Sequence, residues 1–181
     1  MQVLIVSQYF WPENFRINAI VESLVERGIK VDVLTGKPNY PEGVVFSGYK
    51  AWGCQKEQWN GATVYRVPLV PRSQKSSIGL ILNYCSFACF GSIHGSWMLR
   101  KQNYDVIFVY APSPILSVIP ALFIGWLKSI KVITWVQDLW PESLSATGYV
   151  NNKSIIAIVR HLVRFIYRHN DLLLVQSQAF E

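Results

Sequence analysis

The chain has 181 residues, which is enough for one domain with a full core or for half of a two-domain protein. Hydrophobic residues make up 51% of it and aromatic residues 14%, which excludes a disordered tail or a charged scaffold. The net charge of +6 and the pI near 9.3 indicate an anionic partner, namely a phosphorylated substrate, an acidic membrane surface or a nucleic acid.

The first 35 residues predict a β-α-β unit. Residues 3–7 and 31–35 are apolar runs of strand length, and residues 15–27 carry apolar side chains at helical spacing. A right-handed crossover makes the two strands parallel and places residues 8–14 at the carboxyl end of the first strand. Met1 leads directly into that strand without the positive region of a signal peptide, so we expect a cytoplasmic protein.

The loops after the first two strands predict an anion site. We expect Asn14 to cap the helix and Arg16 to lie in its first turn, where backbone N–H groups and a guanidinium converge on a phosphate. Lys37, Asn39 and Tyr40 follow the second strand on the same edge, and Lys37 is a candidate for the same phosphate. Alternatively, Arg16 and Lys37 are only solvated. No G-x-G-x-x-G fingerprint is present, so no nicotinamide or flavin cofactor is expected.

The middle of the chain contains a long loop and two uncharged stretches, residues 78–99 and 106–127. Residues 36–62 predict a long irregular loop, ordered by its aromatic residues, and residues 63–67 predict a third strand. Residues 78–99 are long enough for a transmembrane helix, but glycines, Asn83 and His94 disfavour insertion. We expect a helix packed on a sheet with one side exposed to lipid or to a lipid substrate, and a full span is the alternative. Residues 106–127 predict a strand, a turn and a buried helix.

The three cysteines, Cys54, Cys85 and Cys89, form no metal-ligand pattern with a nearby histidine. We expect them to be reduced and buried, as in a cytosolic protein.

An apolar run at residues 131–143, KVITWVQDLWPES, is typical of a buried parallel strand that breaks at Asp138. Asp138 and Glu142 then lie past its carboxyl end, where open α/β sheets bind ligands, and they are candidates for catalysis. The alternative is that Asp138 only starts a turn ahead of Pro141.

Residues 153–169 predict a helix, capped by Asn152, with an apolar stripe and a basic one. The basic stripe contains Lys153, Arg160, Arg164 and Arg168. This pattern is typical of a helix lying on an anionic membrane, and also of an ordinary sheet-covering helix with a solvated basic side.

Residues 172–176 predict a sixth strand. The six strands alternate with helices, and no repeat or linker divides them. The predicted fold is a single α/β domain with a Rossmann-like, doubly wound, mostly parallel sheet.

Four segments together resemble a known family. They are VLIVSQYFWPENFR at 3–16, VDVLTGKPNYPEGVVFSGY at 31–49, WVQDLWPES at 135–143 and LLLVQS at 172–177. They are similar to the N-terminal half of family 4 retaining glycosyltransferases with the GT-B fold. Within that family they most resemble the WbuB-type L-fucosamine and N-acetyl-L-fucosamine transferases of bacterial O-antigen and related polysaccharide assembly.

The resemblance implies that these residues bind the acceptor, while a C-terminal domain outside the 181 residues binds the UDP-sugar donor. The fragment alone would then be inactive. The implied acceptor is a polyprenyl-diphosphate-linked sugar at the inner face of the plasma membrane, where the protein would be peripheral. Many family members carry a Gly-Gly pair in the first loop; this chain has none, so Arg16 and Lys37 would carry more of the diphosphate recognition.

For catalysis, the resemblance places Asp138 where family members have an Asp or His facing the donor sugar. Asp138 would orient that sugar and stabilise an oxocarbenium-like centre, and Glu142 is a second candidate. No metal is expected, because clustered carboxylates of the DxD type are absent.

Two other classes remain open. One is a non-catalytic Rossmann-like module that binds anions or nucleic acid, although the basic residues are not interleaved with aromatic ones as on a nucleic-acid surface, so no nucleic acid is expected. The other is a membrane-embedded protein that uses residues 78–99 as a span.

Overall fold

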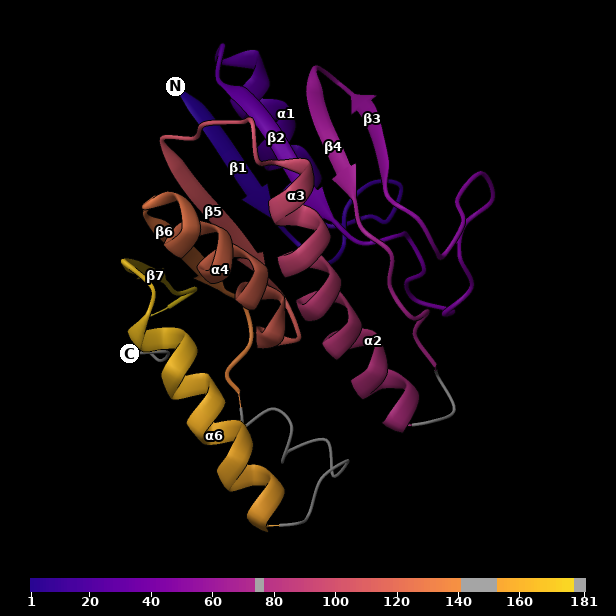
Figure 1. Ribbon diagram of the computed structural model, residues 1–181, viewed down its shortest axis with the longest axis vertical. Helices are drawn as coiled ribbons and strands as arrows, with labels where there is room; N and C mark the ends of the chain where they lie inside the picture. Colours follow the sequence, from indigo (N-terminus) through magenta and orange to yellow (C-terminus); the bar gives the residue numbers. More distant parts are fainter. Residues whose placement is uncertain (74–76, 141–152, 178–181) are drawn as a thin grey trace.

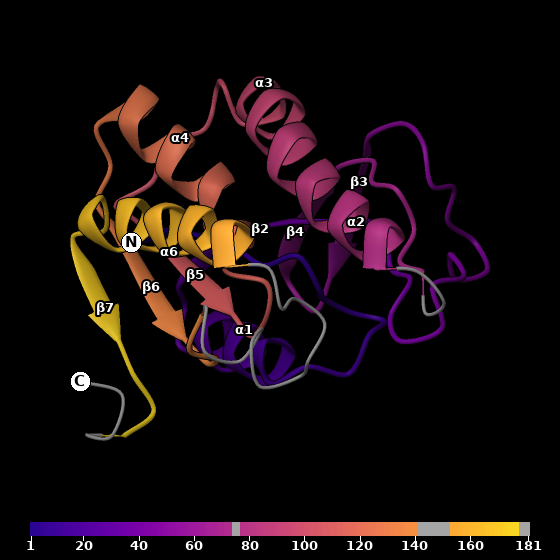
Figure 2. The ribbon, with the colours of Figure 1, turned by 90° about the horizontal axis from the view of Figure 1, so that it is seen from below.

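The computed structural model describes residues 1–73, 77–140 and 153–177. One seven-stranded sheet, in the order β3-β4-β2-β1-β5-β6-β7, carries helices on both faces (Figures 1 and 2). The strands are β1 (Gln2–Val6), β2 (Lys30–Thr35), β3 (Gln55–Trp59), β4 (Ala62–Arg66), β5 (Val106–Ala111), β6 (Val132–Val136) and β7 (Leu172–Leu174). The helical segments are α1 (Arg16–Glu26), α2 (Ser77–Phe90), the π-turn η1 (Gly91–Gly95), α3 (Ser96–Met98), the 3-10 turn η2 (Ile115–Val118), α4 (Ile119–Lys128) and α6 (Lys153–Arg168).

This arrangement confirms the predicted Rossmann-like α/β fold. The six predicted strands correspond to β1, β2 and β4 to β7, and all neighbouring pairs among them are parallel. The expectation that residues 36–62 are irregular throughout is wrong, because β3 lies within them and pairs antiparallel with β4. Its sequence, QKEQW, lacks the apolar residues of the other strands because β3 is an edge strand, buried only in part.

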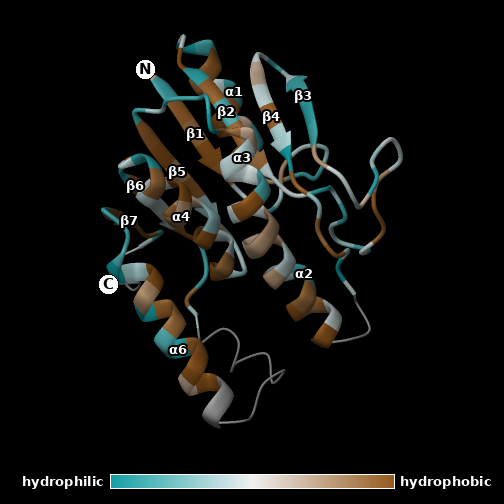
Figure 3. Ribbon diagram, in the orientation of Figure 1, coloured by the Kyte–Doolittle hydropathy of each residue, from teal (hydrophilic) through white to brown (hydrophobic). Residues whose placement is uncertain are grey.

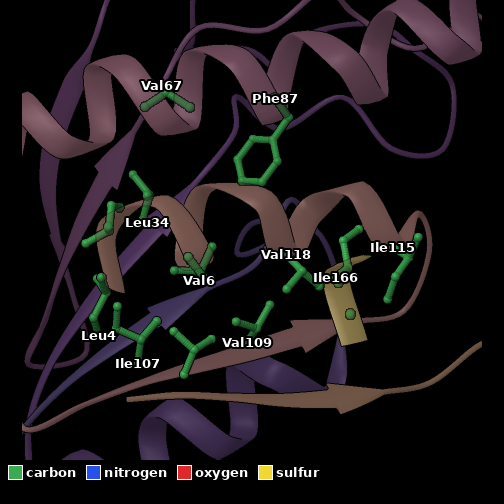
Figure 4. Close-up of a cluster of buried hydrophobic side chains, with 14 of the residues drawn as sticks. Leu4, Val6, Leu34, Val67, Phe87, Ile107, Val109, Ile115, Val118 and Ile166 are labelled. Atoms are coloured by element: carbon green, nitrogen blue, oxygen red, sulfur yellow. The ribbon is translucent and has the colours of Figure 1, made fainter. Parts of the chain in front are cut away.

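The central strand β1 is buried on both faces. Leu4 and Val6 point into the larger hydrophobic cluster, and Val3 and Ile5 point into the smaller one. This is why β1 is a continuous apolar run and not an alternating one. Figure 4 shows the larger cluster, in which side chains of the strands meet Phe87 of α2 and Val118 of η2.

The helices divide unequally between the two faces of the sheet. Helix α1 covers one face, whereas α2, α4 and α6 form a layer on the other (Figure 2). The π-turn packs closely within this layer, since a Cβ added to Gly91 would lie 2.7 Å from Cγ of Pro120 in α4.

The expectation that the cysteines are buried is wrong. Cys54, Cys85 and Cys89 are all free and exposed. Cys85 and Cys89 lie on the side of α2 that faces away from the sheet, while Tyr84, Phe87 and Ala88 of the same helix are buried.

We predict that Phe87→Ala lowers the free energy of unfolding by about 3–5 kcal/mol, because Phe87 has no exposed surface and its loss leaves a cavity between α2 and the sheet. Urea unfolding measures the change. The control is Ile93→Ala, at an exposed position of η1, for which a change within about 0.5 kcal/mol is expected. Equal effects of the two substitutions would contradict this packing.

Candidate functional site

The site is expected at the carboxyl edge of the sheet, where the direction of chain winding changes. From β1 the chain proceeds to β2 on one side, and β5, on the other side of β1, leads on to β6 and β7. The loops that leave β1 and β5 therefore diverge at this point. In open α/β sheets such a switch point is where ligands bind.

The loop after β1 is held by the buried carboxylate of Glu13. Its Oε1 accepts hydrogen bonds from the backbone N–H groups of Asn39 (2.8 Å) and Tyr40 (2.7 Å), and its Oε2 accepts one from Phe10 (3.2 Å). Burial raises the pKa of Glu13, and these amides together with Arg66 oppose the rise. Glu13 thus joins the loop after β1 to the loop after β2.

The buried Arg66, at the end of β4, also joins the loops after β1 and β2. Nε of Arg66 pairs with Glu57 Oε1 at 2.6 Å, Nη1 donates to the carbonyl of Gly36 at 3.2 Å, and Nη2 donates to the carbonyl of Trp11. The guanidinium carbon also lies 4.8 Å from the ring centre of Tyr49. Every side of the Arg66 head group is occupied by protein, so its role is structural.

The structure places the predicted residues of the first loop at the surface. Asn14 is exposed, and the prediction that it caps α1 is wrong, because Phe15 occupies the N-cap position and no side chain caps the helix. Arg16 is the first residue of α1, as predicted, and is exposed. It lies near enough to Tyr110 of β5 to lower the pKa of that phenol, which burial raises.

The predicted residues of the second loop are more deeply placed. Lys37 is buried, and its Nζ donates to Oε1 of Gln55 in β3 at 3.0 Å. Burial lowers the pKa of Lys37, and the nearby Arg66 lowers it further. The contacts of Lys37 lie towards β3 and those of Arg16 towards β5, with β4, β2 and β1 between those strands, which does not support one phosphate shared by both.

Asn39 connects this loop to the segment after β4. Its Nδ2 donates to the carbonyl of Lys37 at 2.9 Å, and its Oδ1 accepts from the backbone N–H of Arg72 at 2.8 Å. Asn39 is buried, so it acts here as a support for Arg72.

Arg72 is a cation at this edge that the sequence analysis missed. Its guanidinium carbon lies 5.0 Å from the ring centre of Tyr40, and that ring packs against Tyr9 (5.2 Å) and Phe15 (5.2 Å). Arg72 also acts on the buried Tyr9: burial raises the pKa of this phenol and the positive charge of Arg72 opposes the rise. Among the residues that the structure describes, Arg72 forms no ion pair with a carboxylate. A half-buried arginine without a carboxylate partner, set among aromatic rings, is suited to bind an anion.

Asp138 lies close to this cluster. It follows β6, as predicted, and is half-buried. Burial raises the pKa of Tyr84 in α2, Arg72 lowers it and Asp138 raises it, so both charged groups lie near this phenol. Tyr84 in turn packs against Trp140 (6.5 Å between ring centres), whose Nε1 donates to Ser113 Oγ in the loop after β5 at 3.3 Å. Glu142 lies outside the residues that the structure describes.

The carboxyl edge therefore offers a cation, Arg72, and a carboxylate, Asp138, which both act on the phenol of Tyr84. Arg72 could have been found from the sequence, because it follows the third predicted strand just as Lys37 follows the second. Tyr84 could not, since it lies in the middle of an apolar helix. In the described ranges, 1–73, 77–140 and 153–177, no three His, Cys, Asp or Glu side chains gather as a metal site would require.

Comparisons with known proteins decide the family. A model of the glycosyl transferase 4-like domain matches residues 14–181. The chain belongs to this family. A putative colanic acid biosynthesis glycosyl transferase, WcaI, of Escherichia coli strain K12 is 28% identical over 159 residues, which are 82% of this chain and 37% of that protein. The chain thus spans little more than a third of the length of this relative.

Membership of the glycosyl transferase 4-like family confirms the broader part of the resemblance seen in the sequence, and it supports a transferase. The seven-stranded, mostly parallel sheet is consistent with the N-terminal half of a GT-B fold.

The buried Glu13 predicts a dependence of stability on pH. Because its pKa is raised in the fold, the folded chain retains this proton more readily than the unfolded chain, where the ordinary value is 4.5. Its contribution to stability is therefore full below pH 4.5 and is lost as the pH rises through the raised value. We expect the unfolding free energy of wild type, relative to Glu13→Gln, to fall as the pH is raised above 4.5.

Urea unfolding at several pH values measures this difference. Glu26→Gln, at an exposed position of α1, is the control and should follow wild type at every pH. A wild-type advantage over Glu13→Gln that increases with pH would contradict the raised pKa.

Proposed function

We propose that this chain is the acceptor-binding part of a retaining glycosyltransferase. In this proposal the enzyme transfers an N-acetyl-L-fucosamine-type sugar from a UDP-sugar to a polyprenyl-diphosphate-linked sugar, in O-antigen or related bacterial polysaccharide assembly. The family membership and the name of the Escherichia coli relative support transfer of a sugar in polysaccharide biosynthesis. The resemblance to WbuB-type enzymes supports the choice of sugar.

The observation that carries the proposal is the placement of Arg72, 5.0 Å from the ring centre of Tyr40, and of the half-buried Asp138, just after β6, at the carboxyl edge of the sheet. A diphosphate-linked sugar has an anionic end and a nucleophilic hydroxyl. Arg72 would hold a phosphate through its guanidinium fork, which matches phosphate oxygens two at a time. The acceptor hydroxyl would then point towards Asp138.

In the reaction, the bond between the anomeric carbon and the UDP oxygen breaks, and a bond from that carbon to the acceptor oxygen forms on the same face of the sugar. The departing phosphate oxygen takes the proton of the acceptor hydroxyl, so no strong enzymic base is required. Asp138 orients the donor sugar and stabilises the positive charge that develops at the anomeric carbon. The UDP-sugar itself is held mainly by a second domain, and these 181 residues alone bind the acceptor without transferring sugar.

The proposed location is the cytoplasmic face of the plasma membrane. Arg160, Arg164 and Arg168 are exposed on α6, as the membrane-facing stripe requires, and Lys153 begins the same helix. Basic side chains near an anionic surface contribute about 1 kcal/mol each at physiological salt. No binding to nucleic acid is part of the proposal.

We expect Arg72→Met to weaken binding of the chain to polyprenyl-diphosphate-GlcNAc in nanodiscs by at least about tenfold, since a hydrogen bond between charged groups contributes about 1.5–3 kcal/mol. Arg16→Met and Lys37→Met are matched controls that test the two cations predicted from the sequence; smaller losses are expected for both. Thermal melting of each variant shows whether the fold is retained, and Arg72→Lys keeps the charge where Met does not.

Arg72→Met with wild-type affinity would contradict the assignment of the phosphate to Arg72. If wild type binds nanodiscs equally with and without the lipid-linked sugar, the proposed function itself fails. Salt-sensitive binding to unrelated RNA would favour the nucleic-acid alternative in that case.

For Asp138 the test requires transfer activity, so it uses the chain together with its donor-binding domain. Asp138→Asn is expected to lower kcat by about 10²-fold or more and to leave KM for the acceptor unchanged, because the carboxylate acts on charge that exists only in the transition state. A change in KM alone would assign Asp138 to acceptor binding instead.

A further inference from the structure

The continuous helical segment from α2 through η1 to α3 is apolar all round, yet protein covers one side of it. Residues Ile78–Met98 are long and apolar enough to cross a membrane by length and composition, and 33% of an 18-residue stretch within them is buried in the structure. Tyr84 and Phe87 pack towards the sheet. An apolar helix in a soluble fold is normally buried all round, so the other side of this segment requires an apolar partner.

That other side is a stripe of exposed apolar residues three or four apart. In chain order they are Ile78, Leu82, Cys85, Cys89, Ile93 and Trp97. Ile93 of the π-turn and Trp97 of α3 continue the stripe at four-residue steps beyond Cys89. Figure 3 shows hydrophobic colouring along most of α2.

Helix α4 extends the stripe sideways. Phe123, Trp126 and Leu127 are exposed on it, and Trp126, at 75%, exposes a larger fraction than any other tryptophan that the structure describes. Nζ of Lys128 donates to the carbonyls of Arg100 (3.3 Å) and Gln102 (2.8 Å), which fastens the end of α4 beside the end of α3. We call the exposed apolar residues of α2, η1, α3 and α4 the outer helix face.

The outer helix face continues into a hollow between α4 and α6. This cavity of about 760 Å³ is lined mostly by apolar side chains, among them Phe123, Trp126 and Phe165, with His169 beside them. Phe123 and Trp126 belong both to the cavity and to the outer helix face. The apolar surface is therefore not flat, and protein side chains do not fill the hollow in it.

Charge identifies the partner that would cover this surface. Helices α2, α3, α4 and α6 and the π-turn contain no Asp or Glu, whereas α1 on the opposite face contains Glu22 and Glu26. The cations at the margin include Arg100, whose guanidinium carbon lies 4.3 Å from the ring centre of Trp97, and Lys128. The cavity is also lined by Asp171, whose carboxylate accepts the backbone N–H of Val132. Exposed tryptophans with neighbouring cations, on helices without carboxylates, are the composition of a surface that sits in the headgroup region of an anionic bilayer.

We propose that the outer helix face inserts into the interfacial layer of an anionic phospholipid bilayer. The helix layer then lies along the membrane, and the carboxyl edge of the sheet, with Arg72 and Asp138, opens beside the headgroups. Insertion comes from the outer helix face, while the arginines of α6 supply long-range attraction. The proposal rests on the proposed function in one respect, that a lipid-linked acceptor must reach this edge from the bilayer.

Sedimentation with vesicles of phosphatidylcholine and phosphatidylglycerol tests the surface directly. Leu82→Ser/Leu127→Ser is expected to bind at least about tenfold more weakly than wild type, because each leucine loses apolar area that the bilayer would cover. The matched control, Leu172→Ser/Leu174→Ser, changes the same residue type on β7; Leu172 is 49% exposed against 51% for Leu82 and Leu127. Equal binding of the two double variants would overturn the proposal.

Brominated lipids provide a second readout that does not depend on affinity. Wild-type tryptophan fluorescence should be quenched on vesicles that contain them, and Trp97→Phe/Trp126→Phe should bind vesicles but lose most of the quenching. Quenching that persists in this variant would show that other tryptophans face the lipid and would overturn the assignment. Retention of wild type in the membrane after an alkaline wash would favour a spanning helix and also overturn it.

A water-soluble, short-chain prenyl-diphosphate-GlcNAc separates this proposal from the proposed function. Leu82→Ser/Leu127→Ser should bind it as wild type does, since the residues that hold Arg72 include Asn39 and Tyr40 but neither of these leucines. If wild type binds vesicles but not the soluble analogue, the proposed membrane surface is supported and the proposed function is wrong. If wild type binds the soluble analogue but not vesicles, only the proposed membrane surface is wrong.

Discussion

The buried pair of anchors formed by Glu13 and Arg66 is the constraint on which the carboxyl edge depends. Glu13 accepts three backbone N–H groups from the loops after β1 and β2, and Arg66 donates to a carbonyl in each of those loops. Neither side chain is free to meet a ligand. Their effect is to fix the backbone on which Tyr9, Tyr40 and Arg72 are held, so the site is organised before any substrate arrives.

Much of the fold could be predicted from the sequence because the parallel strands are buried on both faces. Their sequences are therefore continuous apolar runs. The edge strand β3 escaped prediction since Lys56, Glu57 and Gln58 pair with β4 largely through backbone groups, without an apolar pattern. The cysteines were misplaced for a related reason. The apolar composition of α2 did not show which of its sides faces the sheet, and Cys85 and Cys89 lie on the exposed side.

The candidate site was predictable in position and less so in detail. The rule that ligands bind beyond the carboxyl ends of the strands led to the loops of Asp138 and Lys37, and the structure places these residues after β6 and β2. The rule did not tell which cations have unpaired side chains, because that depends on partners distant in sequence. Gln55 holds Lys37, whereas Arg72 lies against the ring of Tyr40 and, within residues 1–73, 77–140 and 153–177, pairs with no carboxylate. Asn14 and Arg16 remain exposed for a similar reason, since Glu13, not Asn14, organises the turn before α1.

The two edges of the sheet differ in a way that bears on handling the isolated chain. Strand β3 closes one edge with polar and charged residues, a composition that discourages further strand pairing. Strand β7 is the last strand at the other edge, and it exposes Leu172 and Leu174; no strand of the described residues pairs with its outer side. Self-association of the purified chain by strand pairing should therefore start at β7, and a charged substitution there would oppose it.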